Sequence, residues 1–216
     1  MKTASDIVSI ESSVAQNHGL KCSAEQRVEM AYLLAEVFGD PSGVGLEHFE
    51  RLLDFASERP GLNKNSPHLK PGEFQTGWLQ DIVLLLDGEN PLSLDESVYK
   101  AWTKQKSHPL SGATGRCFGD PAAHMIAVLE SFGLSLEPDR GQAPDSLSTL
   151  FEFLGFLLEN RPSGEVVTFC HDHLDWIGEL EQCASRLNAG KALLEVISLA
   201  NVFVHETVDE MEKVDG

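Results

Sequence analysis

The chain has 216 residues, of which 34 are acidic and 16 are Lys or Arg, so its formal net charge at pH 7 is −18. Hydrophobic residues make up 42% of it and charged residues 23%, which is typical of a globular protein that buries a core without disulfides. A phosphate backbone would repel so negative a surface, because nucleic-acid binding depends on Lys and Arg displacing counterions. We therefore expect no nucleic-acid partner, and a basic peptide fits the charge better.

Neither a membrane span nor a secretory signal is apparent in the sequence. No apolar run approaches the roughly 20 residues that a bilayer requires, and the stretch 192–204 is interrupted by Glu195 and Asn201. The N-terminus carries Asp6 and Glu11 and lacks the hydrophobic stretch of a signal peptide. The four cysteines form no CxxC pair, which argues against a zinc ribbon or a disulfide framework. We expect a cytoplasmic protein with reduced cysteines and no integral membrane segment.

Helical periodicity recurs along the chain, and no alternating strand of useful length appears, so we predict an all-α fold. Ser23 and Gln26 form a capping box, which predicts a helix from this point to the Gly-Asp-Pro sequence at 39–41. Apolar residues at helical spacing predict two further helices, within 46–56 and 74–86.

The stretch 89–119 is irregular, and a loop of this length in a compact domain is often functional. An N-cap residue followed by proline is typical of a helix start, so Asp120 and Pro121 predict a helix that ends near Gly133. After a polar linker, Asp145 can cap a strongly apolar helix, which we expect to be central.

The last third of the chain predicts two more helical segments, 166–187 and 189–205. We expect the acidic tail 206–216 to fray, since chain ends are held only where they dock. The helices before and after the polar linker each leave an apolar face that needs the other. The sequence therefore predicts one all-α domain over 1–216, with 1–22 as an N-terminal extension.

A close pair of histidines, His171 and His173, raises the question of a metal site. Alternate positions on a helix point about 200° apart, so these two imidazoles cannot chelate one ion unless the helix breaks there. We expect a structural or peptide-contacting role instead, and no metal.

The stretch 100–119 contains no acid in a chain that is otherwise strongly acidic. Its basic residues are Lys100, Lys104, Lys106 and Arg116. The glycines of 111–119 could expose backbone N–H groups to a phosphate, but the spacing does not fit a P-loop. A possible anion or nucleotide contact at Lys104 and Arg116 therefore stays open beside the simpler interpretation as a loop.

No motif in the sequence supports catalysis. GxSxG, HExxH and GxGxxG are all missing. Single carboxylates such as Glu152 and Asp145 could act as acid or base groups, but a helix cap or a paired charge is the commoner role. We expect a protein that is not an enzyme.

Four segments in chain order carry a resemblance to a known family. An arginine and a tyrosine precede an apolar pair in 27–34, and a proline-containing loop ends in Glu-Ser-Val-Tyr in 90–99. Residues 143–154 read Ala-Pro-Asp-Ser-Leu followed by an acidic, apolar helix, and 173–176 read His-Leu-Asp-Trp. Together they resemble the TorD/DmsD/NarJ family of cytoplasmic molybdoenzyme maturation chaperones.

The resemblance covers about residues 27–205 and includes two departures. Ser146 stands where the family usually has His, and Leu150 where it often has Glu. These differences indicate a divergent branch of the family.

The resemblance implies a TorD-like helical bundle that binds rather than catalyses. Such a redox enzyme maturation protein holds the twin-arginine leader and the apo catalytic subunit of a molybdenum oxidoreductase until molybdopterin is inserted. No cofactor is bound stably, since molybdopterin guanine dinucleotide belongs to the client, although weak guanine nucleotide binding is possible. The resemblance also implies a monomer or a helix-swapped dimer.

We expect the peptide-contacting residues to lie near one groove, with carboxylates for the leader's guanidinium groups beside an apolar surface for its apolar run. These residues are Glu96, Tyr99, Pro144, Asp145, Glu152, His173 and Trp176. Trp176 is better suited to the core than to contact, because large aromatics act mainly by burial. The alternative function is a small all-α nucleotide-binding protein or enzyme that uses the 100–119 loop.

Overall fold

The structure is a computed structural model, and it describes residues 23–40, 43–57, 70–86, 92–136 and 143–214. Within these ranges the chain forms helices and two isolated β-bridges but no strand, so the predicted all-α fold is confirmed. The helices are α1 (Ala24–Gly39), α2 (Leu46–Ser57), α3 (Pro71–Leu86), α4 (Glu96–Tyr99), α5 (Asp120–Ser131), α6 (Leu147–Asn160), α7 (Ser163–His173), α8 (Ile177–Arg186) and α9 (Lys191–Val214).

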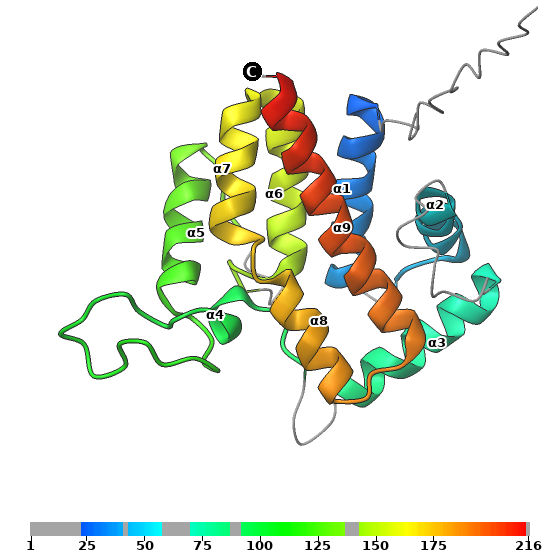
Figure 1. The fold of residues 1–216 in the computed structure, drawn as a ribbon, viewed down its shortest axis with the longest axis horizontal. Helices are drawn as coiled ribbons and strands as arrows, with labels where there is room; N and C mark the ends of the chain where they lie inside the picture. Colours follow the sequence, from blue (N-terminus) through cyan, green and yellow to red (C-terminus); the bar gives the residue numbers. More distant parts are fainter. Residues whose placement is uncertain (1–22, 41–42, 58–69, 87–91, 137–142, 215–216) are drawn as a thin grey trace, which may run out of the picture.

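Helix α6 lies inside the bundle, with α1 on one side and α7 on the other, while α9 crosses α7, α8 and α3 (Figure 1). The central place of α6 follows from its composition, because apolar residues occupy more of its circumference than they do on a typical surface helix. Its buried apolar residues are Leu147, Leu150, Phe151, Phe153, Leu154 and Leu157. One hydrophobic cluster joins them to α1, α3, α7, α8 and α9.

The close packing of α1 on α6 depends on a glycine. A Cβ atom at Gly155 would lie 2.8 Å from a ring carbon of Tyr32, closer than real contacts allow. Helix α1 itself begins as predicted, because Ser23 and Gln26 form the capping box. The tyrosine can therefore lie across α6 only because residue 155 has no side chain.

The predicted helix 166–187 is wrong in one respect, because the chain breaks into α7 and α8 at residues 174–176. The indole Nε1 of Trp176 donates to the carbonyl of His173 at 2.7 Å. This side-chain donor satisfies a carbonyl that the end of α7 leaves without a helical partner. Both histidines lie on α7 before this break, where alternate positions point apart: His171 is exposed near Glu212, and His173 is buried.

The expected fraying of the tail 206–216 is also wrong, since α9 continues to Val214. Thr207 is fully buried, and the side chain of Arg27 on α1 forms an ion pair with Glu210. The tail is therefore held by tertiary contacts that its acidic composition does not reveal.

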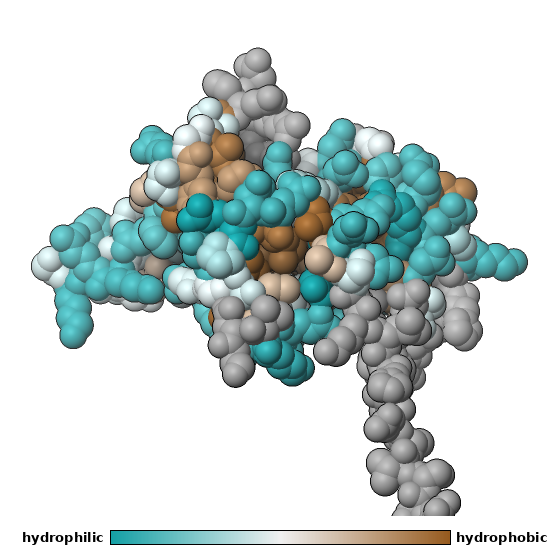
Figure 2. Space-filling view, turned by 90° about the horizontal axis from the view of Figure 1, so that it is seen from above, coloured by the Kyte–Doolittle hydropathy of each residue, from teal (hydrophilic) through white to brown (hydrophobic). Residues whose placement is uncertain are grey.

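No helix in the described ranges combines the length and the apolarity that crossing a bilayer requires. Figure 2 shows apolar side chains gathered near the centre of one face of the molecule, with hydrophilic side chains around them. Exposed apolar groups that gather in this way are typical of interaction surfaces.

Candidate functional site

The loop before α4 and the turn before α6 pair through their backbones. The amide of Glu96 donates to the carbonyl of Asp145 at 2.9 Å, and the amide of Leu147 donates to Leu94 at 2.8 Å. This pairing brings two of the expected site segments side by side, although they are far apart in the sequence.

Asp145 does not cap α6, although its position in the sequence allowed that role. Ser146 is the N-cap of α6, and its hydroxyl accepts from the amide of Thr149. The carboxylate of Asp145, fully buried, instead accepts from the amide of Ser97 at 2.8 Å and from the Ser97 hydroxyl. The Asp145 carboxylate thus satisfies a free N–H at the start of α4. The N-cap residue of α4, Asp95, makes no such hydrogen bond with its own side chain.

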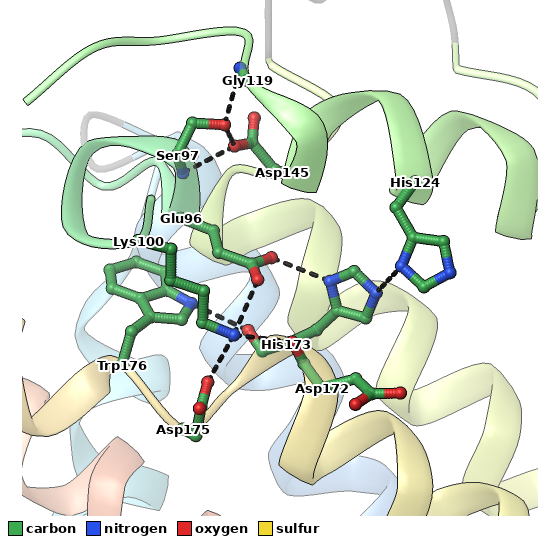
Figure 3. A network of polar contacts seen from close by, with 10 residues as sticks. All are labelled: Glu96, Ser97, Lys100, Gly119, His124, Asp145, Asp172, His173, Asp175 and Trp176. Atoms are coloured by element: carbon green, nitrogen blue, oxygen red, sulfur yellow. Dashed lines mark hydrogen bonds and ion pairs between the residues drawn. The ribbon is translucent and has the colours of Figure 1, made fainter. Parts of the chain in front are cut away.

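A second set of contacts centres on Glu96, which is 1% exposed (Figure 3). One carboxylate oxygen lies 2.8 Å from Nδ1 of His173, and the other lies 2.9 Å from Nζ of Lys100. Lys100 also contacts the carboxylate of Asp175 at 2.5 Å and donates to the carbonyl of Asp172. Glu96 therefore joins α4 to the end of α7 and to the turn that follows it.

Burial alone would lower the pKa of Lys100, but hydrogen bonds and the charges of Asp175 and Glu96 outweigh it, and the pKa is raised. The ammonium group is therefore charged at neutral pH and compensates the buried carboxylate of Glu96.

The His173 ring continues the network to α5. Because Nδ1 of His173 faces a carboxylate, it carries a proton, and its Nε2 lies 3.0 Å from Nδ1 of His124. The two imidazoles are also stacked, with ring centroids 4.9 Å apart. His124 is exposed, so this chain of contacts runs from a buried carboxylate to the surface.

Trp176 and Tyr99 form the apolar side of the same region. Their rings are stacked with centroids 4.9 Å apart, and the hydroxyl of Tyr99 donates to the carbonyl of Ser93 at 2.7 Å. Burial raises the pKa of Tyr99, so the phenol is neutral. Trp176 is 2% exposed, which confirms its place in the core.

The structure thus brings six of the expected peptide-contacting residues into one region and places the seventh elsewhere. The six are Glu96, Tyr99, Pro144, Asp145, His173 and Trp176. Glu96, Asp145, His173 and Trp176 are almost wholly buried, so they hold segments together rather than offering side chains to a ligand. Glu152 is exposed and lines a cavity between α1 and α6.

Apart from Lys100, which pairs with Glu96, the basic residues expected to contact an anion lie outside this network. Lys104 and Arg116 are both exposed on the loop between α4 and α5, which projects from the bundle (Figure 1). Three glycine amides of this loop already have acceptors: Gly112 donates to Thr103 in the loop, and Gly115 and Gly119 donate to Val98 and Ser97 of α4. These N–H groups are therefore not available to cradle a phosphate.

Four members of the network were not among the site residues predicted from the sequence: Ser97, Lys100, His124 and Asp175. The spacing of Glu96 and Lys100 at i and i+4 was a usable signal for their ion pair. Nothing in the sequence around His124 or Ser97 indicates their partners, because those contacts join distant segments.

A family model described as "Nitrate reductase delta subunit" matches residues 75–183, half of the chain. No curated protein matches the chain. No solved structure matches it either. The matched range contains every residue of the network, from Glu96 to Trp176. The chain therefore belongs to the nitrate reductase delta subunit family, the NarJ/TorD type of chaperone.

Proposed function

We propose that this protein is a maturation chaperone for the catalytic subunit of a nitrate reductase-type molybdenum oxidoreductase. It binds the N-terminal leader of the apo subunit in the cytoplasm, keeps the subunit competent for molybdopterin insertion, and delays export until assembly is complete. Its activity is binding without turnover. The observation that carries the proposal is the family match over residues 75–183.

The charge of the chain supports this proposal. A leader with adjacent arginines and an apolar run needs carboxylates near an apolar surface. The chain has a net charge of −18, and one face presents apolar side chains surrounded by hydrophilic ones (Figure 2). The buried polar network supports the same role indirectly, because it fixes the relative positions of α4, α5, α6 and α7.

The nucleotide alternative has no support from the geometry of the 100–119 loop. Its glycine amides already donate to Thr103, Val98 and Ser97, and the side chains of Lys104 and Arg116 are exposed. We therefore propose no nucleotide-dependent function.

Co-expression with the catalytic subunit of a nitrate reductase-type molybdoenzyme tests the proposal. We expect the chain to copurify with the subunit and to raise its molybdenum content, and a subunit without its leader to lose most of this association. A Lys104→Ala/Arg116→Ala variant is expected to act as the wild type does. Equal molybdenum content with and without the chain would show that the proposal is wrong.

A further inference from the structure

A cavity of about 770 Å³ lies between the second half of α1, the segment 43–48 at the start of α2 and the first half of α6. The lining residues that matter here are Tyr32, Glu36, Asp40, His48, Ser148 and Glu152. Pockets that hold ligands commonly have volumes of about 300–1,000 Å³. The cavity is therefore large enough for side chains of a partner.

Carboxylates line this cavity because of the helical spacing of α1. Tyr32, Glu36 and Asp40 lie four residues apart in turn, which places them along one face of the helix. Glu152 faces the same space from α6. Among the described lining residues three carry carboxylates, and none is Lys or Arg.

The position of two of these carboxylates makes a bound cation more favourable. Glu36 lies in the last turn of α1 and Asp40 is its C-cap, and that turn contains no basic residue. The C-terminus of a helix carries a partial negative charge, which repels acidic side chains and attracts cations. A cationic ligand at this end of α1 would relieve the repulsion between the helix dipole and both carboxylates.

Two rings of the cavity, Tyr32 and His48, contact carboxylates. Burial, followed by the hydrogen bond to Glu159, raises the pKa of Tyr32 to about 12, so the phenol is neutral. Nδ1 of His48 accepts from the amide of Gly45 at 3.1 Å, and Nε2 lies 3.1 Å from the carboxylate of Glu36. The ring of His48 therefore orients the carboxylate of Glu36 at the cavity.

We propose that the α1–α6 cavity binds guanidinium groups of an arginine-rich peptide segment, with Glu36 and Glu152 as the main carboxylate contacts. The proposal rests on the proposed function, because the segment is the part of the leader that carries its arginines. A planar guanidinium forms paired hydrogen bonds with carboxylates, which a lysine ammonium cannot reproduce. Buried Val44 beside the cavity gives the stem of an arginine an apolar contact.

Titration calorimetry with a synthetic peptide tests this site. The probe carries two adjacent arginines followed by a leucine- and alanine-rich run, and a control probe has citrulline, which is uncharged and of similar shape, in place of both arginines. We expect the wild-type protein to bind the citrulline probe about ten-fold more weakly. High salt is expected to reduce but not abolish binding of the arginine probe, because burial of the apolar run does not depend on charge.

The Glu36→Gln/Glu152→Gln variant is expected to bind the arginine probe about ten-fold more weakly than the wild type, and to bind the citrulline probe as the wild type does. Glu130→Gln is the matched control, because Glu130 is exposed on α5 and does not line this cavity. That control is expected to change binding less than about two-fold. Circular dichroism confirms that each variant is folded.

Two results would overturn the site while leaving the proposed function in place. One is a Glu36→Gln/Glu152→Gln variant that binds the arginine probe as tightly as the wild type. The other is an equal loss of affinity for the arginine probe in the Glu130→Gln variant, because the effect would then come from the overall charge of the protein. Failure of the wild type to bind either probe would instead count against leader binding itself.

Discussion

The carboxylate of Glu96 lies 2.8 Å from Nδ1 of His173, and 77 residues separate the two in the sequence. Both side chains are almost wholly buried, so water cannot replace the contact if one partner is removed. The other oxygen of Glu96 contacts Lys100, so this one carboxylate holds two elements of the fold.

Glu96→Ala is expected to lower the free energy of unfolding by about 3 kcal/mol, because it leaves Lys100 and His173 without their buried acceptor. Urea denaturation followed by circular dichroism measures the change. Glu130→Ala, at an exposed position on α5, is expected to cost less than about 0.5 kcal/mol. A similar small loss for Glu96→Ala would mean that the network contributes little.

Asp145→Ala is expected to be more destabilising than Ser146→Ala, although the two residues are adjacent. Removing the Ser146 cap of α6 costs about 1 kcal/mol. Removing the Asp145 carboxylate leaves buried donors of Ser97 unpaired, at a cost of about 2–3 kcal/mol. A double-mutant cycle of Asp145→Ala with Ser97→Ala should show coupling between them, and strictly additive losses would contradict the contact.

Asp95→Asn is expected to stabilise the protein at neutral pH. Burial first, and then the charge of Asp145, raise the pKa of Asp95 above its ordinary value of 3.8. At pH values between the ordinary pKa of Asp95 and its raised pKa in the folded state, the folded state therefore binds more protons than the unfolded state. Stability falls as the pH rises through that window. Asparagine carries no charge, so the advantage of the variant should grow from acid to neutral pH in urea denaturation. An advantage that is independent of pH would contradict the raised pKa.

Truncation after His205 is expected to lower the free energy of unfolding by at least about 2 kcal/mol, because it removes buried Thr207 and leaves Arg27 without Glu210. Removal of residues 215–216 alone is the control and should have little effect. Thermal unfolding compares the two truncations. Equal melting temperatures would restore the expectation of a frayed tail.

Cooperative unfolding in these experiments also bears on the number of domains. The hydrophobic cluster contains residues of helices on both sides of residues 137–142. A single transition seen by all probes is expected for one domain, which stays a prediction from the sequence.

The sequence determined the helical class, because apolar residues at helical spacing and local caps such as Ser23 with Gln26 act within a few residues. It also determined the family, through segments in a fixed order that the family model matches over residues 75–183. The central place of α6 followed in the same way from its apolar composition.

Only the tertiary structure decided what the polar residues do. From the sequence, Asp145 could cap the helix that follows it, but the approach of the 92–99 loop gives it the donors of Ser97 instead. The break after His173, the ordered end of α9 and the carboxylate-lined cavity beside α1 likewise depend on partners distant in sequence. Local sequence fixes backbone preference, whereas a buried charge takes whichever partner the packing of the helices brings within hydrogen-bond distance.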